Sequence, residues 1–407
     1  MEWAGVWHVY VRTWNWCSPW KTKEKPGRFQ LSVNGTRLDN ELGLGERWDW
    51  EYAGSIEIKE KLNRVTLHDL TGFNGRCDAI LFTKEKEVRI PNEGEPMRKF
   101  RKKLTGLPEQ PGNGGTYDLV VVGAGTAGLG AAIKGAREGL KVALIHNRPV
   151  PGGNNSVEVQ VVASGGLNIE PYPRLGDVVR EIKNVYRRPA HVDSIIGAEK
   201  NLTFFPNMHV FTLEKEGDRI ASVTAKHIET NVETVFHAPV FIDCTGDGNI
   251  GFLAGAEYRV GREMRGETRE TLAPNRPDNM VLGTSLTWWS KNTGQETVFP
   301  ECEWAIQFNE ESCEKVTRGS NWWETGFLYD QVNEAEFIRD YLFRAIYGNW
   351  AFLKNNSKDK AGFAKLDLET VFYVAGKRES RRLVGDVLLT QQDTEGAYVK
   401  AFSNAEE

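Results

Sequence analysis

Hydrophobic and polar positions follow a period of two in the first part of the chain. Short segments such as GVWHVYVRTW, GRFQLSVNG and NRVTLHDL alternate apolar and polar side chains, and turn residues separate them. The pair Asn34 and Gly35 is typical of a tight hairpin turn. This pattern predicts an antiparallel β-sandwich or jelly roll over residues 1–95. We expect this domain to resemble carbohydrate-binding modules.

Tryptophan is concentrated in this predicted sandwich, and the sandwich core is where we expect most of these side chains. Trp14, Trp16 and Trp20 stand in a stretch that resembles a loop. We therefore expect at least one of these three to be exposed and to stack on a sugar ring or on a neighbouring domain.

The pattern changes after residue 95. Residues 96–115 are first basic and then rich in proline and glycine, which is typical of a solvated linker. An apolar run at 119–122 has the composition of a buried parallel strand, a small-residue helix follows, and a second strand is expected at 141–145. A strand, a helix and a strand in this order predict an α/β domain, whose first part we place at residues 116–256.

A glycine motif joins the first of these strands to the helix. Gly123, Gly125 and Gly128 have the spacing G-x-G-x-x-G. The first glycine permits a tight turn, the second lets the backbone approach a pyrophosphate, and the third lets the helix pack closely against the strand. The helix N-terminus would then direct backbone N–H groups at the phosphates.

The acidic residue that usually binds the ribose of a dinucleotide is absent after the second strand. His146, Asn147 and Arg148 stand there instead. A neutral histidine can hydrogen-bond a ribose hydroxyl, and Arg148 could bind the 2′-phosphate of NADP. The motif alone therefore leaves FAD, NAD and NADP open.

Further along the chain, residues 176–188 predict an amphipathic helix, and residues 201–246 predict successive strands. The last of these strands runs into TGDGNIG, a second glycine turn at the start of a helix. We interpret residues 257–375 as a substrate or cap region with a long helix at 333–355, and residues 376–407 as a return to the first α/β domain.

Composition excludes several classes of function. The net charge is −5, without the basic stripe of a nucleic-acid-binding protein, and no apolar run is long enough to span a membrane. The five cysteines form no C-x-x-C pair, which argues against a bound metal or iron–sulfur cluster. There is no G-x-S-x-G motif for a hydrolase nucleophile.

Three stretches together resemble one known family. DLVVVGAGTAGLGAAIKGAREGLKVALIHNRPVPGGNNSVEV, FIDCTGDGNIGFLAGAEY and GKRESRRLVGDVLLTQQD are similar to the FAD-dependent oxidoreductases of bacterial polysaccharide-degrading settings, some of which carry a xanthan-lyase-like label. The resemblance covers nearly the whole chain. It implies a Rossmann-like FAD-binding domain of the glutathione-reductase type, with an N-terminal all-β sandwich and an inserted α+β region, and it implies FAD as the cofactor.

The resemblance also implies a set of cofactor-binding residues. The glycine motif would sit at the pyrophosphate and His146 at the ribose, the loop after Arg148 would line the flavin side, and the backbone of Val210 would face the adenine. The implied residues are Gly123, Gly125, Gly128, His146, Arg148, Gly152, Gly153, Asn154, Asn155, Val210, Gly246, Asp247 and Gly248.

A charge cluster near the C-terminal end is the candidate for substrate chemistry. Arg378, Glu379 and Arg381 are expected to clamp an anion or sugar hydroxyls beside the flavin, and a solvated helix start is the alternative. The expected reaction is hydride transfer from a carbohydrate-related or polyol substrate, with His191 or Glu379 as the base. The electron acceptor stays open.

Two other functions remain open from the sequence, an NAD(P)-dependent dehydrogenase and a non-catalytic sugar-binding protein. The family resemblance implies a closing strand, turn and helix well after the stretch RESRRLVGD, which TQQDTEGAYVKAFSNAEE does not provide. We therefore expect a longer reading frame, which would supply this segment and an export signal to the periplasm, and weak FAD binding by residues 1–407 alone.

Overall fold

The computed structural model describes residues 3–164, 167–168, 173–319 and 323–394, which divide into two compact units. Unit 1 comprises residues 1–109, 292–315 and 343–367, and unit 2 comprises residues 110–291, 316–342 and 368–407. The division differs from the predicted domains, because residues 257–375 do not form a body of their own but contribute to both units. The C-terminal stretch from 395 lies outside the described residues.

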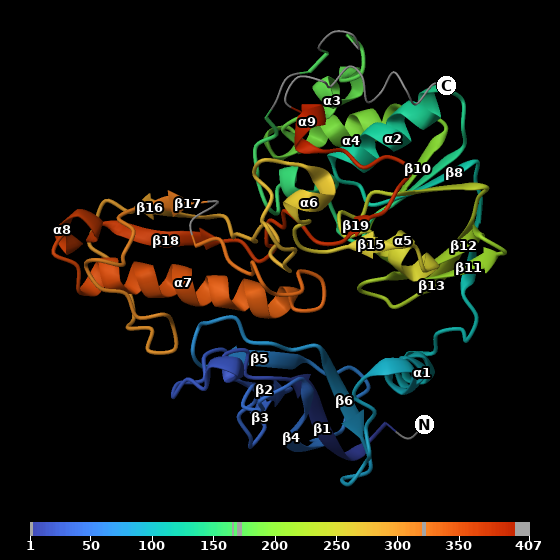
Figure 1. Ribbon diagram of the computed structural model, residues 1–407. Helices are drawn as coiled ribbons and strands as arrows, with labels where there is room; N and C mark the ends of the chain where they lie inside the picture. Colours follow the sequence, from blue (N-terminus) through green and yellow to red (C-terminus); the bar gives the residue numbers. More distant parts are fainter. Residues whose placement is uncertain (1–2, 165–166, 169–172, 320–322, 395–407) are drawn as a thin grey trace. The chain divides into compact units, whose positions relative to one another are not determined.

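A four-stranded parallel sheet forms the centre of unit 2 (Figure 1). Its spatial order is β10-β9-β8-β14, which is the third, second, first and fourth of these strands along the chain. This 3-2-1-4 order is typical of Rossmann-like folds. The strands are β8 (Leu119–Val122), β9 (Val142–Ile145), β10 (Leu202–Phe205) and β14 (Val240–Asp243).

Alternate side chains of β8 and β9 point to two different buried clusters, so every position of both strands is apolar. Val121 and Leu144 belong to a buried cluster with α2 (Thr126–Arg137), α3 (Asp177–Ile182) and α4 (Pro189–Ala198). Val120 and Ile145 belong to a second cluster, which the strands of another sheet complete. The prediction of fully buried strands at this point is confirmed, since every residue of β8 and β9 is buried.

The second sheet of unit 2 has the order β11-β12-β13-β7 and is antiparallel except for its β7 edge. It packs against the parallel sheet through residues such as Val223 and Phe236, both fully buried. Its strands are β7 (Gly112–Thr116), β11 (Met208–Glu216), β12 (Arg219–His227) and β13 (Glu233–His237).

The remaining elements of unit 2 are short, and three elements begin in one unit and end in the other. The short elements are α5 (Asn249–Ala254), β15 (Tyr258–Arg259), α6 (Arg265–Thr268), β17 (Arg318–Gly319), β19 (Arg382–Leu383) and α9 (Gln391–Thr394). The three shared elements are β16 (Trp288–Asn292), α7 (Ala335–Asn355) and β18 (Leu366–Val371).

Unit 1 contains two three-stranded antiparallel sheets, β4-β1-β6 and β3-β2-β5. Side chains from both sheets, such as Val9, Val11 and Leu31, share one buried cluster. The elements are β1 (Gly5–Thr13), β2 (Phe29–Val33), β3 (Thr36–Arg37), β4 (Asp49–Ile58), β5 (Val65–Asp69), β6 (Ala79–Thr83), α1 (Gly94–Thr105) and α8 (Lys360–Phe363).

The segment at residues 96–115, predicted as a solvated linker, contains regular secondary structure. Most of this segment is α1 followed by β7. The helix forms because Glu95 and Arg98 make an ion pair within its first turns and Gly106 ends it in a left-handed conformation. The basic residues belong to a helix with one partly buried face, so composition alone gave the wrong structure.

No helix among the described residues combines the length and the apolar character needed to cross a lipid bilayer.

The expectation of an exposed tryptophan at Trp14, Trp16 or Trp20 is wrong as well. Trp16 is 1% exposed and packs edge-on against the rings of Trp304 and Phe343, which the later segments of unit 1 supply. The other two are half-buried. The core of unit 1 therefore includes residues that lie nearly 300 positions apart in the chain.

We expect Trp16→Ala to lower the free energy of unfolding of unit 1 by about 3–5 kcal/mol, because it removes a fully buried ring. Chemical denaturation followed by tryptophan fluorescence measures this change. Trp3→Ala is the matched control, since Trp3 is 38% exposed. Equal stability of the two variants would contradict the role given to Trp16.

Candidate functional site: a dinucleotide cavity

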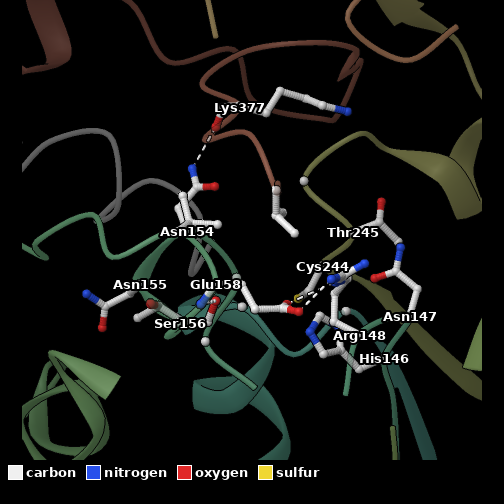
Figure 2. A pocket seen from close by; sticks show the side chains of 18 of the residues that line it. His146, Asn147, Arg148, Asn154, Asn155, Ser156, Glu158, Cys244, Thr245 and Lys377 are labelled. Atoms are coloured by element: carbon white, nitrogen blue, oxygen red, sulfur yellow. Dashed lines mark hydrogen bonds and ion pairs between the residues drawn. The ribbon is translucent and has the colours of Figure 1, made fainter. Parts of the chain in front are cut away.

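A cavity of about 570 Å³ lies where β8, β9 and β14 reach their carboxyl ends in unit 2 (Figure 2). Ligands of open α/β sheets bind at this edge. Of the predicted cofactor residues, those lining the cavity are Gly123, Gly125, His146, Arg148, Gly152, Gly153, Asn154, Asn155, Val210, Gly246 and Asp247. Gly128 and Gly248 do not line it.

The three glycines of the first motif meet three different environments. Gly123 has φ +101°, and a Cβ there would lie 2.2 Å from the carbonyl oxygen of Cys244. A Cβ on Gly128 would lie 1.8 Å from the carbonyl oxygen of Gly123. A Cβ on Gly125 would have nothing within 4 Å and would occupy open space at the cavity. Only the second glycine thus leaves room that a ligand can fill.

His146 is buried at the cavity wall, and its ring is held in one tautomer. The backbone N–H of Ala124 donates to Nδ1 of His146 at 3.1 Å. Because Nδ1 accepts, the ring proton lies on Nε2, and Nε2 is buried without a hydrogen-bond partner among the described residues. Burial lowers the pKa of His146 to about 4, and the carbonyl of Val150 opposes this shift only in part. The ring is therefore a neutral donor at neutral pH.

Arg148 lines the same cavity, but its guanidinium is already bonded to a carboxylate. Its Nε donates to Glu158 at 2.9 Å, and Figure 2 shows the two side chains joined. Hydrogen bonding to Glu158 raises the pKa of Arg148. This pairing removes the main sequence argument for a 2′-phosphate, because the fork of Arg148 is engaged inside the protein.

The loop after Arg148 folds back on the glycine motif. The N–H of Gly152 donates to the carbonyl of Ala124 at 2.7 Å, and both Gly152 and Gly153 have positive φ. Asn155 is 5% exposed, donates to the Val161 carbonyl and accepts from the Val185 N–H, so its amide holds the loop in shape.

Asn154 joins this loop to a distant segment of unit 2. Its Nδ2 donates to the carbonyl of Lys377 at 2.6 Å, a bond drawn in Figure 2. Lys377 also lines the cavity, and its Nζ lies 2.8 Å from a carboxylate oxygen of Asp247. One lysine thus links both glycine-rich loops on the cavity wall.

The second glycine turn follows β14, as the sequence predicts, and α5 begins at Asn249. Asp243 holds the turn, because its carboxylate accepts from the N–H groups of Thr245 and Ile250. Gly248 lies close to Leu383 rather than to the cavity. A Cβ on Gly248 would lie 3.2 Å from the leucine side chain. Its role is to let β19 pack against the turn.

The candidate catalytic residues separate in the structure. Arg378 lines the cavity and bonds both carboxylate oxygens of Glu324, at 2.8 and 3.0 Å. Glu379 also lines the cavity and accepts from the N–H of Leu282. Arg381 does not line it; its guanidinium lies 4.0 Å from the ring centre of Phe252 and donates to Asn249.

Two further expectations about this region are wrong. The segment from Arg378 to Arg381 is an extended loop rather than a solvated helix start. His191 is exposed on α4 and does not line the cavity, so its position excludes it as the base.

The sequence analysis missed several residues of the cavity. Thr126, Glu158 and Lys377 line it and were not named as site residues, although all three lie within stretches that carry the family resemblance. Cys244 also lines the cavity, and burial raises the pKa of its thiol, which keeps it protonated. The other missed lining residues are Ile145, Val150, Ser156, Val159, Val161, Val162, Ala163, Met208, His209, Thr245, Asn249 and Val374.

A Rossmann-like sheet, two glycine turns at its carboxyl edge and a buried histidine donor on the cavity wall define a dinucleotide-binding protein. Residues 118–404 match the FAD dependent oxidoreductase family, and this chain belongs to that family.

Curated relatives match shorter segments. NADH:fumarate oxidoreductase of Klebsiella pneumoniae is 32% identical over 36% of this chain and 16% of its own length. Soluble pyridine nucleotide transhydrogenase of Ectopseudomonas mendocina is 32% identical over 31% of this chain and 25% of its own length. The all-trans-zeta-carotene desaturase of Myxococcus xanthus is 27% identical over 39% of this chain and 32% of its own length. The chain thus spans at most a third of these relatives.

Solved structures are similar only in part. L-proline dehydrogenase of P. horikoshii is 16% identical with a TM-score of 0.26, covering 58% of this chain and 32% of its own. THI4 of Thermovibrio ammonificans is 16% identical with a TM-score of 0.29, covering 44% of this chain and 80% of its own. Likeness at this level supports no conclusion about function.

FAD is the cofactor of this family, and the residues present fit it. The open space at Gly125 accommodates a pyrophosphate, and the unpartnered Nε2 of His146 matches a ribose hydroxyl oxygen.

Gly125→Val should fold and lose its flavin, because the branched side chain fills that space. Flavin absorbance after purification measures occupancy, and Gly130→Val is the matched control, since Gly130 lies on α2 away from the cavity. Full occupancy in Gly125→Val would count against this placement.

The low pKa of His146 predicts acid sensitivity. Unfolded histidine takes up a proton near pH 6.5 and the folded protein only near pH 4, so the free energy of unfolding falls as the pH falls through this window. Between pH 7 and pH 5 the loss from this residue is about 2 kcal/mol. His146→Asn keeps an acceptor for the Ala124 N–H and should lose less stability over the same range in urea titrations. Parallel curves for the two proteins would refute the assignment.

The two arginines should respond differently to removal. Arg381→Ala should lower the free energy of unfolding by about 1–2 kcal/mol, because its guanidinium packs on Phe252 and bonds Asn249. Arg378 is half-exposed, so Arg378→Ala should change stability by less than about 1 kcal/mol and affect substrate turnover instead. Thermal unfolding and turnover are measured on both. The reverse ranking would contradict the geometry.

Proposed function

We propose that this protein is an oxidoreductase in which a carbohydrate-related or polyol substrate is oxidised at an alcohol carbon. The observation that carries the proposal is the cavity, with its open glycine turn and its neutral, buried histidine donor. FAD, when bound, supplies a hydride acceptor. The family resemblance supports the carbohydrate class of substrate.

The residues of the chain would bind and orient the cofactor. The N-terminus of α2 directs backbone N–H groups at the diphosphate, and Nε2 of His146 donates to a ribose oxygen. Backbone of the β11 strand near Val210 borders the adenine side. The apolar side chains of Val159 and Val161 exclude water from the opposite part of the cavity.

Oxidation of an alcohol also requires a proton acceptor. As the carbon gives up its hydride, the hydroxyl must lose a proton, and a carbonyl results. Glu379 is the candidate base, since it lines the cavity and stands on the same segment as Arg378. Arg378 would then hydrogen-bond the substrate oxygen atoms.

The proposal includes the organisation of the chain. We propose that the two sheets of unit 1 form a β-sandwich and that unit 2 carries the FAD-binding domain. An NAD(P)-dependent dehydrogenase is less well supported, since Arg148 is engaged by Glu158. One observation distinguishes a non-catalytic sugar-binding protein from the proposed enzyme. In the enzyme, the substrate reduces the bound flavin, and in the sugar-binding protein it does not.

Anaerobic titration of the FAD-loaded protein tests the function. Addition of sorbitol, glucose or gluconate should bleach the flavin band near 450 nm, with first-order kinetics that saturate with substrate. Arg378→Ala should raise the half-saturating concentration, with Arg262→Ala as control, since Arg262 pairs with Asp278 away from the cavity. Persistent oxidised flavin with every polyol would refute the substrate class, and absence of bound FAD would refute the cofactor assignment.

A further inference from the structure

A second cavity, of about 410 Å³, lies in unit 2 and shares part of its wall with the first. Arg148, Val374 and Lys377 line both. The other residues that line the second cavity are Thr284, Gln331, Ala335, Glu336, Ile338, Arg339, Tyr373 and Ala375. A molecule held here would adjoin the large cavity through these shared residues.

The charges around the second cavity favour an anion. Three cationic side chains line it, Arg148, Arg339 and Lys377, against one acidic side chain, Glu336. The carboxylates that pair with Arg148 and Lys377 belong to the wall of the large cavity. Arg339 pairs with the fully buried Asp340 and also with Glu336, on the wall of the second cavity itself. The positive ends of three ion pairs therefore border one small volume.

Tyr373 lies among these cations. The guanidinium of Arg339 is 4.2 Å from the centre of its ring. Although burial opposes it, Asp340 and Tyr373 raise the pKa of Arg339, and Tyr373 also contributes to the raised pKa of Arg148 after Glu158. Tyr373 thus packs against one guanidinium group and lines the same cavity as the other, and the tyrosine is 49% exposed.

The wall opposite is polar and rigid. The hydroxyl of Thr284 donates to Oε1 of Gln331 at 2.7 Å, and Nε2 of Gln331 donates to the Gly326 carbonyl at 2.6 Å. Thr284 and Gln331 are both 3% exposed. A buried hydrogen-bonded pair of this kind has a fixed orientation, which suits recognition of a polar ligand.

We propose that the second cavity binds an anionic group of the substrate, a carboxylate or a phosphate, with Tyr373 donating a hydrogen bond to it and Arg339 and Lys377 supplying the positive field. The inference rests on the proposed function for the location of the redox centre, and it narrows the substrate to an acidic or phosphorylated polyol. Tyr373 is a binding residue in this assignment, since it contacts the anion directly.

The test compares charged and neutral ligands of the same size on the FAD-saturated protein. Thermal unfolding midpoints are measured against concentration for gluconate, sorbitol 6-phosphate and sorbitol. Binding of at least one anion should be about tenfold tighter than that of sorbitol, and whichever anion binds distinguishes carboxylate from phosphate. Inorganic phosphate serves as a probe without the polyol chain.

The variant Tyr373→Phe removes only a hydroxyl and keeps the ring over Arg339. It should weaken anion binding by about tenfold and leave sorbitol binding unchanged, because a hydrogen bond to a charged ligand is lost. Tyr329→Phe is the matched control, since Tyr329 is 44% exposed and does not line the cavity.

Three results would overturn the inference. One is equal binding of charged and neutral ligands by the wild-type protein. The second is anion binding that Tyr373→Phe does not weaken. Anion binding that FAD abolishes would also overturn the inference, because the cationic side chains of the cavity would then bind the cofactor rather than the substrate. FAD binding is measured separately by absorbance, and the ligand titrations are repeated without FAD, so failure of the cofactor assignment is distinguished from failure of this one.

Discussion

The close approach of three backbone segments is the constraint on which the site depends. The turn at Gly123, the start of α2 at Gly128 and the end of β14 at Cys244 meet with no room for a single additional carbon atom. This contact brings the first and fourth strands of the parallel sheet together and aligns their carboxyl ends. Between these two closely packed glycines, the space beside Gly125 is open toward the cavity.

The same contact determines what His146 can do. Its Nδ1 accepts the N–H of Ala124, which is part of the turn itself, so the turn selects the tautomer. A carboxylate after the second strand of a dinucleotide-binding fold accepts hydrogen bonds, whereas the neutral histidine found here offers an N–H donor from the same place in the sheet.

The sequence pattern predicted the parts of the fold that depend on interactions between residues close together in the chain. The strand, turn and helix from Leu119 onward could be predicted from the glycine spacing, because Gly123 and Gly128 stand where a side chain would meet backbone atoms. The α1 helix was missed because its basic composition suggested a linker, although its Glu95–Arg98 pair and its stop at Gly106 are local signals. The Trp16 environment was missed because Trp304 and Phe343 are far away in sequence. The candidate site shows the same limit, because Lys377 reaches the cavity from a segment with no recognised cofactor motif.

The alternation of chain segments between the two units has a consequence for dissection of this protein. Three segments of unit 1 alternate with three of unit 2, so the chain passes from one unit to the other five times. No single cut releases either unit whole. A fragment that ends near residue 95 would retain both small sheets but leave Trp16 without its aromatic neighbours, and the exposed ring would favour self-association. A test of whether the first strands bind sugars therefore requires the full chain, where that surface is covered.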